Sequence, residues 1–335
     1  DLDPLEGLGG LENLESIAGV LEIRDCDNAA FTSLAPLSTS LTSVGGTIYL
    51  RDNASIESLT GLEALSGTIA GDIYFYNNDQ LADISALDAI TQVDGNVTVD
   101  YLPNLTSVDL DSLSSVGGSF FLWNCDAVPD LDPLTALTSV GDALYISGND
   151  SLADLGNAGA TRGVYQLATI GGTLNLSSND NLSDVSALSN VTVIGSAYPS
   201  DYKSASLYLS ANPELSSLVG LDAITEIRGD LRIDDCGTEI GSELTDLTDL
   251  DAVQTVNGRI YISWCHKLTT LFGASSALTA INGDSNGETI RISNNNGLVD
   301  LAGVTGSGTG VTTVDEVYVQ ANPALTSLSG LDNIT

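Results

Sequence analysis

One repeated pattern constrains the fold of this chain more than any other feature of its sequence. The segment L-x-I-x-x-N/C-x-x-L-x-x-L recurs along the 335 residues, with clear copies in LYISGNDSLADL from Leu144 and LYLSANPELSSL from Leu207. In most copies a further L-x-x-[IV]-x-G precedes the next repeat. Successive copies lie 23 to 33 residues apart, which is typical of a solenoid in which each repeat forms one coil.

The Asn or Cys of this pattern occupies one aligned position, which we call the ladder. An Asn amide at a turn can pair with backbone groups that a buried turn cannot leave unsatisfied, and Cys can replace it as a small buried residue. The ladder is interrupted once, at Leu102. Its other members are Cys26, Asn53, Asn78, Cys125, Asn149, Asn179, Asn212, Cys236, Cys265, Asn295 and Asn322.

The L-x-I core of each repeat places one outward residue between two apolar ones, which is the pattern of a strand with one buried face. We therefore predict a β-rich solenoid of about twelve parallel strands in one sheet. The prediction treats residues 1–335 as a single solenoid domain. Neither end has the polar coil that usually caps a repeat array. We therefore expect part of a longer chain or an end-to-end assembly.

This pattern resembles the leucine-rich-repeat superfamily, and its G-x-L-x-I-x-x-N cadence is closest to the L domains of growth-factor and insulin receptors. The resemblance covers essentially the whole chain. It implies a right-handed coil and extracellular recognition by the strand face or its edges. The chain departs from the family in having more coils than one receptor L domain, and in lacking the Cys-rich modules that accompany such domains. No family binding residue can be carried over individually.

The charge of the chain excludes some partners. Asp and Glu number 45 against 9 Lys and Arg, which gives a formal charge of -36. Nucleic acids and anionic membrane surfaces require a basic patch, so both are disfavoured. No apolar run approaches the roughly 20 residues that span a bilayer, so we expect no membrane insertion. The acids indicate either a heavily solvated surface or weak binding of divalent cations along rows of Asp; no other cofactor is expected.

All four cysteines fall on the ladder, which argues against a disulfide framework. Cys26 and Cys125 are four coils apart, too far for a bond. Only Cys236 and Cys265 lie in adjacent coils. Because parallel side chains in a ladder seldom have the dihedral angle of a disulfide, we favour buried free thiols over a bond at this pair. The sequence offers no metal ligand set.

Eight Asn-x-Ser/Thr sequons permit an extracellular, glycosylated product. Asn53 and Asn149 belong to the inward-facing ladder and should be inaccessible to a glycan. The glycosylation candidates are therefore Asn96, Asn104, Asn175, Asn181, Asn190 and Asn333.

Sequence motifs of catalysis are lacking. The one histidine, His266, follows a ladder Cys on a repeat turn, where we expect a solvent-exposed residue rather than a catalyst. The chain has no nucleophile elbow, phosphate-binding loop or zinc-type His/Cys grouping. We therefore predict that it is not an enzyme. An insertion over residues 196–206 is either a simple surface loop or a partner contact.

The outward position of the strands carries a row of aromatic residues that the repeat does not require. One interpretation is a ligand-binding surface, since Tyr supplies contact area together with a hydroxyl. The other is that aromatic residues pair well across a sheet and favour strands. The candidate residues, including two in the next outward column, are Tyr49, Tyr74, Tyr76, Phe121, Trp123, Tyr145, Tyr208, Tyr261 and Tyr318.

These features leave two functional hypotheses. The first is an extracellular structural or adhesive solenoid, which includes a filament subunit that stacks end to end with itself. The second is a receptor-type recognition module that binds a protein or glycan ligand on its sheet face. An ice- or mineral-binding surface is disfavoured because the outward columns lack a regular row of Thr.

Overall fold

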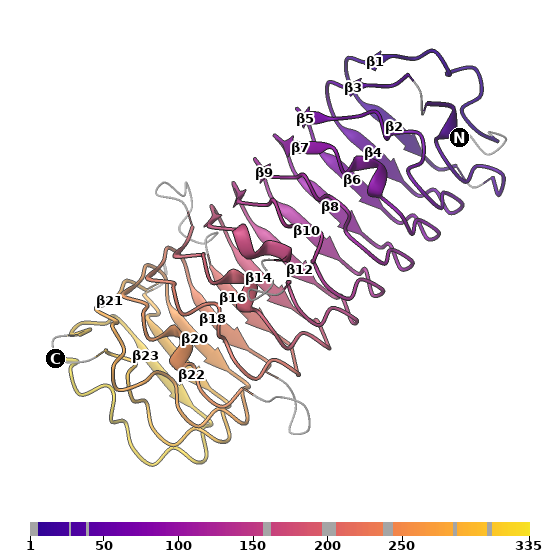
Figure 1. The fold of residues 1–335 in the computed structure, drawn as a ribbon. Coiled ribbons are helices and arrows are strands. Elements are labelled where there is room, and N and C mark those ends of the chain that lie inside the picture. The colour runs from indigo at the N-terminus through magenta and orange to yellow at the C-terminus, as the bar shows by residue number, and fades with distance from the viewer. Residues whose placement is uncertain are drawn as a thin grey trace. The chain divides into compact units, whose positions relative to one another are not determined.

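The computed structural model describes residues 6–26, 28–37, 40–156, 162–195, 206–236, 244–283, 287–306 and 310–335. The insertion at 196–206 therefore lies outside the described residues, apart from Ser206. The chain divides into two compact units, Asp1–Leu167 and Ala168–Thr335. Each unit is a parallel β-solenoid in which successive coils stack on one another (Figure 1).

Twelve strands of four residues form a parallel sheet in chain order, which we call the main sheet. The prediction of a parallel β-solenoid with about twelve strands is confirmed. In the first unit the strands are β2 (Leu21–Arg24), β4 (Ile48–Arg51), β6 (Ile73–Tyr76), β8 (Val97–Asp100), β10 (Phe120–Trp123) and β12 (Leu144–Ser147). In the second they are β14 (Leu174–Ser177), β16 (Leu207–Ser210), β18 (Leu231–Asp234), β20 (Ile260–Ser263), β22 (Ile290–Ser293) and β23 (Val317–Gln320).

The alternation of side chains along these strands separates the core from the sheet surface. In β4, for example, Ile48 and Leu50 are buried, whereas Tyr49 is half-buried and Arg51 is exposed. Equivalent residues of neighbouring strands lie opposite one another, so Tyr49 of β4 lies beside Tyr74 of β6. We use the term sheet face for the second and fourth residues of the main-sheet strands, which point away from the core.

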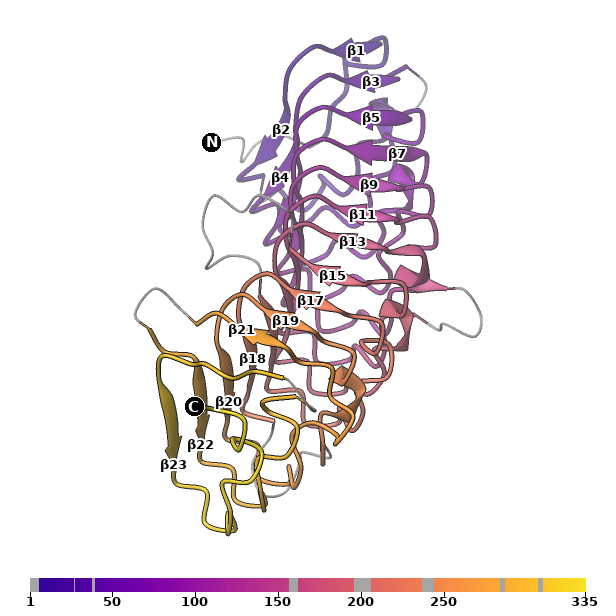
Figure 2. The ribbon, with the colours of Figure 1, turned by 90° about the vertical axis from the view of Figure 1, so that its left-hand side faces the viewer.

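A second parallel sheet is formed by the return segments, which the sequence pattern did not predict as strands. Figure 2 shows β5, β7, β9 and β11 lying side by side in the first unit. The short strands of this unit are β1 (Ser16–Ile17), β3 (Ser43–Val44), β5 (Gly67–Ile69), β7 (Ile90–Val93), β9 (Ser115–Val116) and β11 (Ser139–Val140). Of these, β1 and β3 pair only with each other, as a separate two-stranded sheet. Those of the second unit are β13 (Thr169–Ile170), β15 (Val193–Ile194), β17 (Glu226–Ile227), β19 (Thr255–Val256) and β21 (Ala280–Ile281).

The turn between a short strand and the next main-sheet strand requires glycine where coils approach closely. A Cβ atom at Gly117 would lie 2.2 Å from the carbonyl oxygen of Asp94 in the preceding coil. Among the described residues, helical structure is limited to short 3-10 segments, and no helix has the length and apolarity to cross a membrane. These segments are η1 (Ala35–Leu37), η2 (Ser85–Leu87), η4 (Gly163–Gln166), η5 (Ser186–Leu188) and η6 (Thr248–Leu250).

Each main-sheet strand ends in a turn with the same backbone conformation. The residue directly before the ladder has a positive φ in all twelve coils, from 46° at Asp235 to 70° at Gly148. Seven of these residues are Asp, Asn or Gly, which tolerate this left-handed region. Tyr101, Ala211 and Trp264 are among the five that are less suited to it.

The ladder side chains tie each coil to the one before it. Asn53 is fully buried; its Oδ1 accepts a hydrogen bond from the Cys26 N–H at 3.3 Å, and its Nδ2 donates to the Ile23 carbonyl at 3.0 Å. Asn295 forms the equivalent pair of bonds, with the Cys265 N–H at 2.9 Å and the Ile262 carbonyl at 3.2 Å. Since the backbone at the turn has few partners of its own, the Asn amides supply them.

Candidate functional site

The sheet face of the first unit carries two aromatic clusters. In the first, the rings of Tyr49 and Tyr74 stack with centroids 4.7 Å apart and planes at 6°. Tyr76 lies 6.4 Å from Tyr74 and contacts the edge of Tyr101 at 5.7 Å. The Arg51 guanidinium lies over the Tyr76 ring at 5.3 Å. Neighbouring strands therefore bring together rings that are far apart in the sequence.

The second cluster of this unit consists of Phe121 and Trp123 of β10 with Tyr145 of β12. Phe121 lies 4.8 Å from Trp123 and stacks on Tyr145 at 5.2 Å. Strand β8 separates the two clusters with the buried residues Thr98 and Asp100. Burial raises the pKa of the Asp100 carboxyl above its ordinary value.

In the second unit, tyrosine and arginine alternate over five consecutive strands of the main sheet. Arg232 lies over the rings of Tyr208 and Tyr261, at 4.9 Å from each centroid. Arg291 lies 5.6 Å from the Tyr261 ring and 4.4 Å from the Tyr318 ring. These cations occupy ring faces, so the ring edges and hydroxyl groups are the parts of the tyrosines left for a partner.

Carboxylates hold the arginines of this row in place. Asp234 accepts hydrogen bonds from Nε and Nη2 of Arg232 at 2.8 and 2.6 Å. Glu288 pairs with Arg291 at 3.1 Å and with Arg259 at 2.5 Å. Stacking and ion pairing together restrict these long side chains, which gives the sheet face a fixed chemical pattern.

The sheet face differs in charge from the rest of the chain. Over its strands the first unit has two arginines and two carboxylates, and the second unit has two arginines and one carboxylate. The whole chain, in contrast, has a formal charge of -36. The acidic residues therefore lie mainly off the sheet face. These charged residues are Arg24, Arg51, Glu22 and Asp100 in the first unit and Arg232, Arg291 and Asp234 in the second.

Two open hollows meet at Trp264 in the second unit. The first has a volume of about 560 Å³, and its lining includes Tyr208, Arg232, Asp235 and Tyr261. The second has a volume of about 710 Å³, and Trp264 lines both. The Trp264 side chain is 52% exposed, which makes it one of the most exposed large apolar residues of the chain. The lining of the second hollow also includes His266, Asn294, Asn296 and Pro323.

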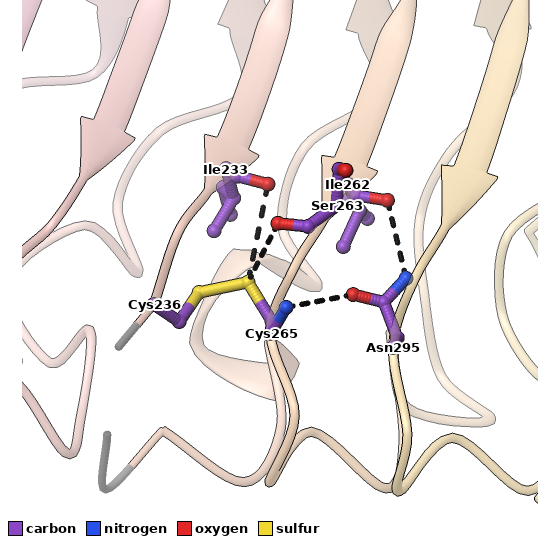
Figure 3. Close-up of a disulfide and its surroundings, with 6 residues drawn as sticks. All are labelled: Ile233, Cys236, Ile262, Ser263, Cys265 and Asn295. Carbon is purple, nitrogen blue, oxygen red and sulfur yellow. Dashed lines mark hydrogen bonds between the residues drawn. A yellow bond between two sulfur atoms is a disulfide. The ribbon is translucent and has the colours of Figure 1, made fainter. Parts of the chain in front are cut away.

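A disulfide joins the two turns beside the first hollow. Cys236 and Cys265 are bonded, with their Cα atoms 4.7 Å apart (Figure 3). The prediction of free thiols is therefore wrong for this pair, because adjacent coils bring these two ladder positions within bonding distance. Asp235 and Trp264 are the residues directly before the two cysteines. The other two cysteines are buried, and burial raises the pKa of the Cys125 thiol to about 12.

The histidine lies in the second hollow rather than free in solvent as we expected. His266 is half-buried, and its ring forms a T-shaped pair with Trp264, with the ring centroids 5.9 Å apart. Its Nδ1 atom is buried and has no hydrogen-bond partner among the described residues. Within the described ranges no group of three or more His, Cys, Asp or Glu side chains could hold a metal ion. That the chain is not an enzyme stays a prediction.

Comparison with known proteins does not identify a family for this chain. No protein-family model matches the chain, and no curated protein is significantly similar to it. The assignment of a function therefore depends on the fold and on the residues of the sheet face.

The sequons differ in their accessibility. Asn53 and Asn149 are fully buried in the ladder. Asn96 is half-buried and its Oδ1 accepts a hydrogen bond from the Ser119 N–H at 2.8 Å, so its amide is already used within the fold. The exposed candidates are Asn104, Asn181 and Asn190, and the half-buried ones are Asn175 and Asn333.

Sequence reasoning identified the rings of the sheet face but not Trp264. This residue lies on the turn that follows β20, outside the outward strand columns that the repeat defines. The residues before the ladder could have identified Trp264. This position holds Asp, Asn or Gly in seven of the twelve coils and an aromatic residue only at Tyr101 and Trp264.

Proposed function

We propose that this chain is an extracellular adhesive solenoid that binds a protein or glycan partner on its sheet face, without catalysis. We also propose that it belongs to the leucine-rich-repeat superfamily and that its coils are similar in pattern to those of receptor L domains. The observation that carries the proposal is the gathering of aromatic and arginine side chains on the nearly neutral sheet face of each unit, in a chain with a formal charge of -36.

Aromatic residues and arginine are enriched at protein interfaces, and they contribute most to binding when they are held rigidly. On this sheet face the rings are restrained by stacking, as between Tyr49 and Tyr74. Arginines such as Arg232 are restrained by ion pairs. Little conformational entropy is then lost on binding. The acidic residues elsewhere keep the remaining surface solvated and repel unspecific contacts between copies.

An extracellular setting is supported by the bond between Cys236 and Cys265, because disulfides persist mainly in oxidising compartments. It is also consistent with the exposed sequons at Asn104, Asn181 and Asn190. Peptide mapping of the native protein should find glycans at exposed sequons. A glycan on Asn53, which is fully buried, would contradict the register of the ladder. End-to-end assembly and weak cation binding stay predictions.

The proposal can be tested with the full chain on a printed array of glycans and secreted proteins. The test variant combines Tyr74→Ser, Tyr145→Ser and Tyr208→Ser, which remove three half-buried rings from the sheet face. We expect the wild type to bind at least one array feature and the variant to bind it about tenfold more weakly, because truncation of interface tyrosines commonly costs this much.

A matched control changes three exposed acids on the turns directly after the ladder. It combines Asp79→Ala, Asp126→Ala and Asp180→Ala, which create no new sequon, and should bind as the wild type does. The melting temperature of each variant separates a loss of binding from a loss of folding. If the folded tyrosine variant binds like the wild type, or if only the acid variant loses binding, the sheet face is not the recognition surface.

A further inference from the structure

We propose that Trp264 and the two hollows beside it form a binding site for a neutral oligosaccharide. This inference rests on the proposed recognition function, to which it adds a ligand class and a place.

Folding alone does not account for a tryptophan at this position. The Trp264 side chain is 52% exposed, so it adds little to the core. The φ of Trp264 is 59°, in a region that bulky side chains avoid. In seven of the twelve equivalent turns this position holds Asp, Asn or Gly, which tolerate the region. One edge contact with His266, at 5.9 Å, helps to fix the indole while a ring face remains able to contact a ligand.

The polar groups around this ring suit a sugar. A pyranose presents apolar C–H groups that pack on an aromatic face, and hydroxyl groups that both donate and accept hydrogen bonds. In the second hollow, Asn294 and Asn296 carry amides that can do the same. No hydrogen bond between described residues engages either side-chain amide. In the first hollow, Asp235 is exposed and can accept from hydroxyls, and Arg232 can donate.

The charges favour a neutral ligand over a charged one. Asp234 and Asp235 line the first hollow together with Arg232, and Arg232 is already paired with Asp234 at 2.6 Å. An anionic sugar would meet the exposed Asp235 and a chain of formal charge -36. A cationic peptide would find only Asp235 as an unpaired carboxylate in the first hollow, and the lining of the second hollow contains no carboxylate.

The disulfide pre-organises the site. Cys236 and Cys265 follow directly after Asp235 and Trp264, so their bond fixes the turn that bears the carboxylate relative to the turn that bears the indole. The two hollows lie on either side of Trp264, which points to a ligand of several sugar units in contact with both. A rigid site loses less entropy when such a ligand binds.

The test is calorimetric titration of the full chain with cellohexaose, mannohexaose and chitohexaose, and with hexalysine as the cationic probe. The variant is Trp264→Gly, because glycine accepts the φ of 59° and removes the ring without backbone strain. The matched control is Ser178→Gly, which places glycine at the equivalent turn position, where φ is 55°, outside the linings of both hollows.

We expect at least one hexasaccharide to bind the wild type and the Ser178→Gly variant equally, and the Trp264→Gly variant about tenfold more weakly, as loss of one stacking residue implies. The proposal is overturned if none of the three sugars binds, if Trp264→Gly leaves binding unchanged, or if hexalysine alone binds at Trp264. Each of these results would overturn only the site at Trp264. Recognition by the sheet face would still be supported if the triple tyrosine variant loses binding on the array.

Discussion

The ladder gives the sharpest prediction about stability. We consider the change Asn78→Ala in the first unit. The Asn78 side chain is fully buried. Its Oδ1 accepts hydrogen bonds from the N–H and the Nδ2 of Asn53, at 3.2 and 3.0 Å. Its Nδ2 donates to the carbonyls of Leu50 and Tyr76, both at 3.1 Å. Alanine removes all four bonds without giving water access to the site.

The cost follows from the groups that lose their partners. A buried N–H left unpaired, as at Asn53, costs about 1–3 kcal/mol, and the lost bond to the Leu50 carbonyl adds about 1 kcal/mol. We therefore expect the free energy of unfolding to fall by about 2–4 kcal/mol. The matched control is Asn104→Ala, which removes a single exposed bond to the Asp79 carbonyl at 2.7 Å. A surface change of this kind should cost about 0.5 kcal/mol or less.

Urea denaturation followed by circular dichroism measures both variants. Because repeat arrays can unfold in parts, hydrogen exchange at the Asn53 amide should be measured as well, and it should accelerate in Asn78→Ala but not in Asn104→Ala. If Asn78→Ala is no more destabilising than Asn104→Ala, or if the Asn53 amide exchanges as in the wild type, the ladder does not hold the coils together as described.

Three further predictions concern other features of the two units. Replacing both Cys236 and Cys265 by Ser opens a loop with a sequence separation of 29 and should lower the unfolding free energy in urea by about 3.5 kcal/mol; no loss would show that the bond adds nothing to stability. Ala211 has a φ of 52°, and Ala211→Gly relieves the strain of this left-handed backbone, so it should raise that free energy by about 0.5–1 kcal/mol. The control Ala223→Gly changes a residue whose backbone is not left-handed and should give no such gain. Burial raises the pKa of Asp100, so the fold favours the protonated carboxyl group. The contribution of Asp100 to the free energy of unfolding therefore falls as the pH rises above the ordinary pKa of a carboxyl group. Asp100→Asn should therefore raise the urea midpoint at pH 7 but not at about pH 3, and equal gains at both would contradict this reasoning.

Much of the fold follows from the sequence because the repeat states one pattern many times. Alternation alone places Ile48 and Leu50 inside and Tyr49 outside, as the structure has them. The second sheet was missed because two-residue strands such as Ser115–Val116 are too short to show a period. The left-handed turns could have been recognised from the recurrence of Asp, Asn and Gly before the ladder.

The candidate site was less predictable because it depends on contacts across coils. The sequence places Tyr208 and Tyr261 in one column, but only the structure shows that Arg232 lies over both rings at 4.9 Å. The bond between Cys236 and Cys265 was not predicted, because the sequence shows only that the two cysteines lie in adjacent coils. Whether their side chains can meet depends on the geometry of the two turns, which the sequence does not give. Trp264 was missed because it belongs to no strand.

Hydroxyl-radical footprinting tests the central claim most directly, because it reports the exposure of individual aromatic rings in the complete protein. The full chain would be labelled free and while bound to the array feature that retains it. The account predicts that Tyr74, Tyr145 and Tyr208 on the sheet face become less oxidised on binding, while Tyr165, which lies in η4 off the sheet face, stays unchanged. Protection of Tyr165 without protection of the three sheet-face rings would contradict recognition by the sheet face.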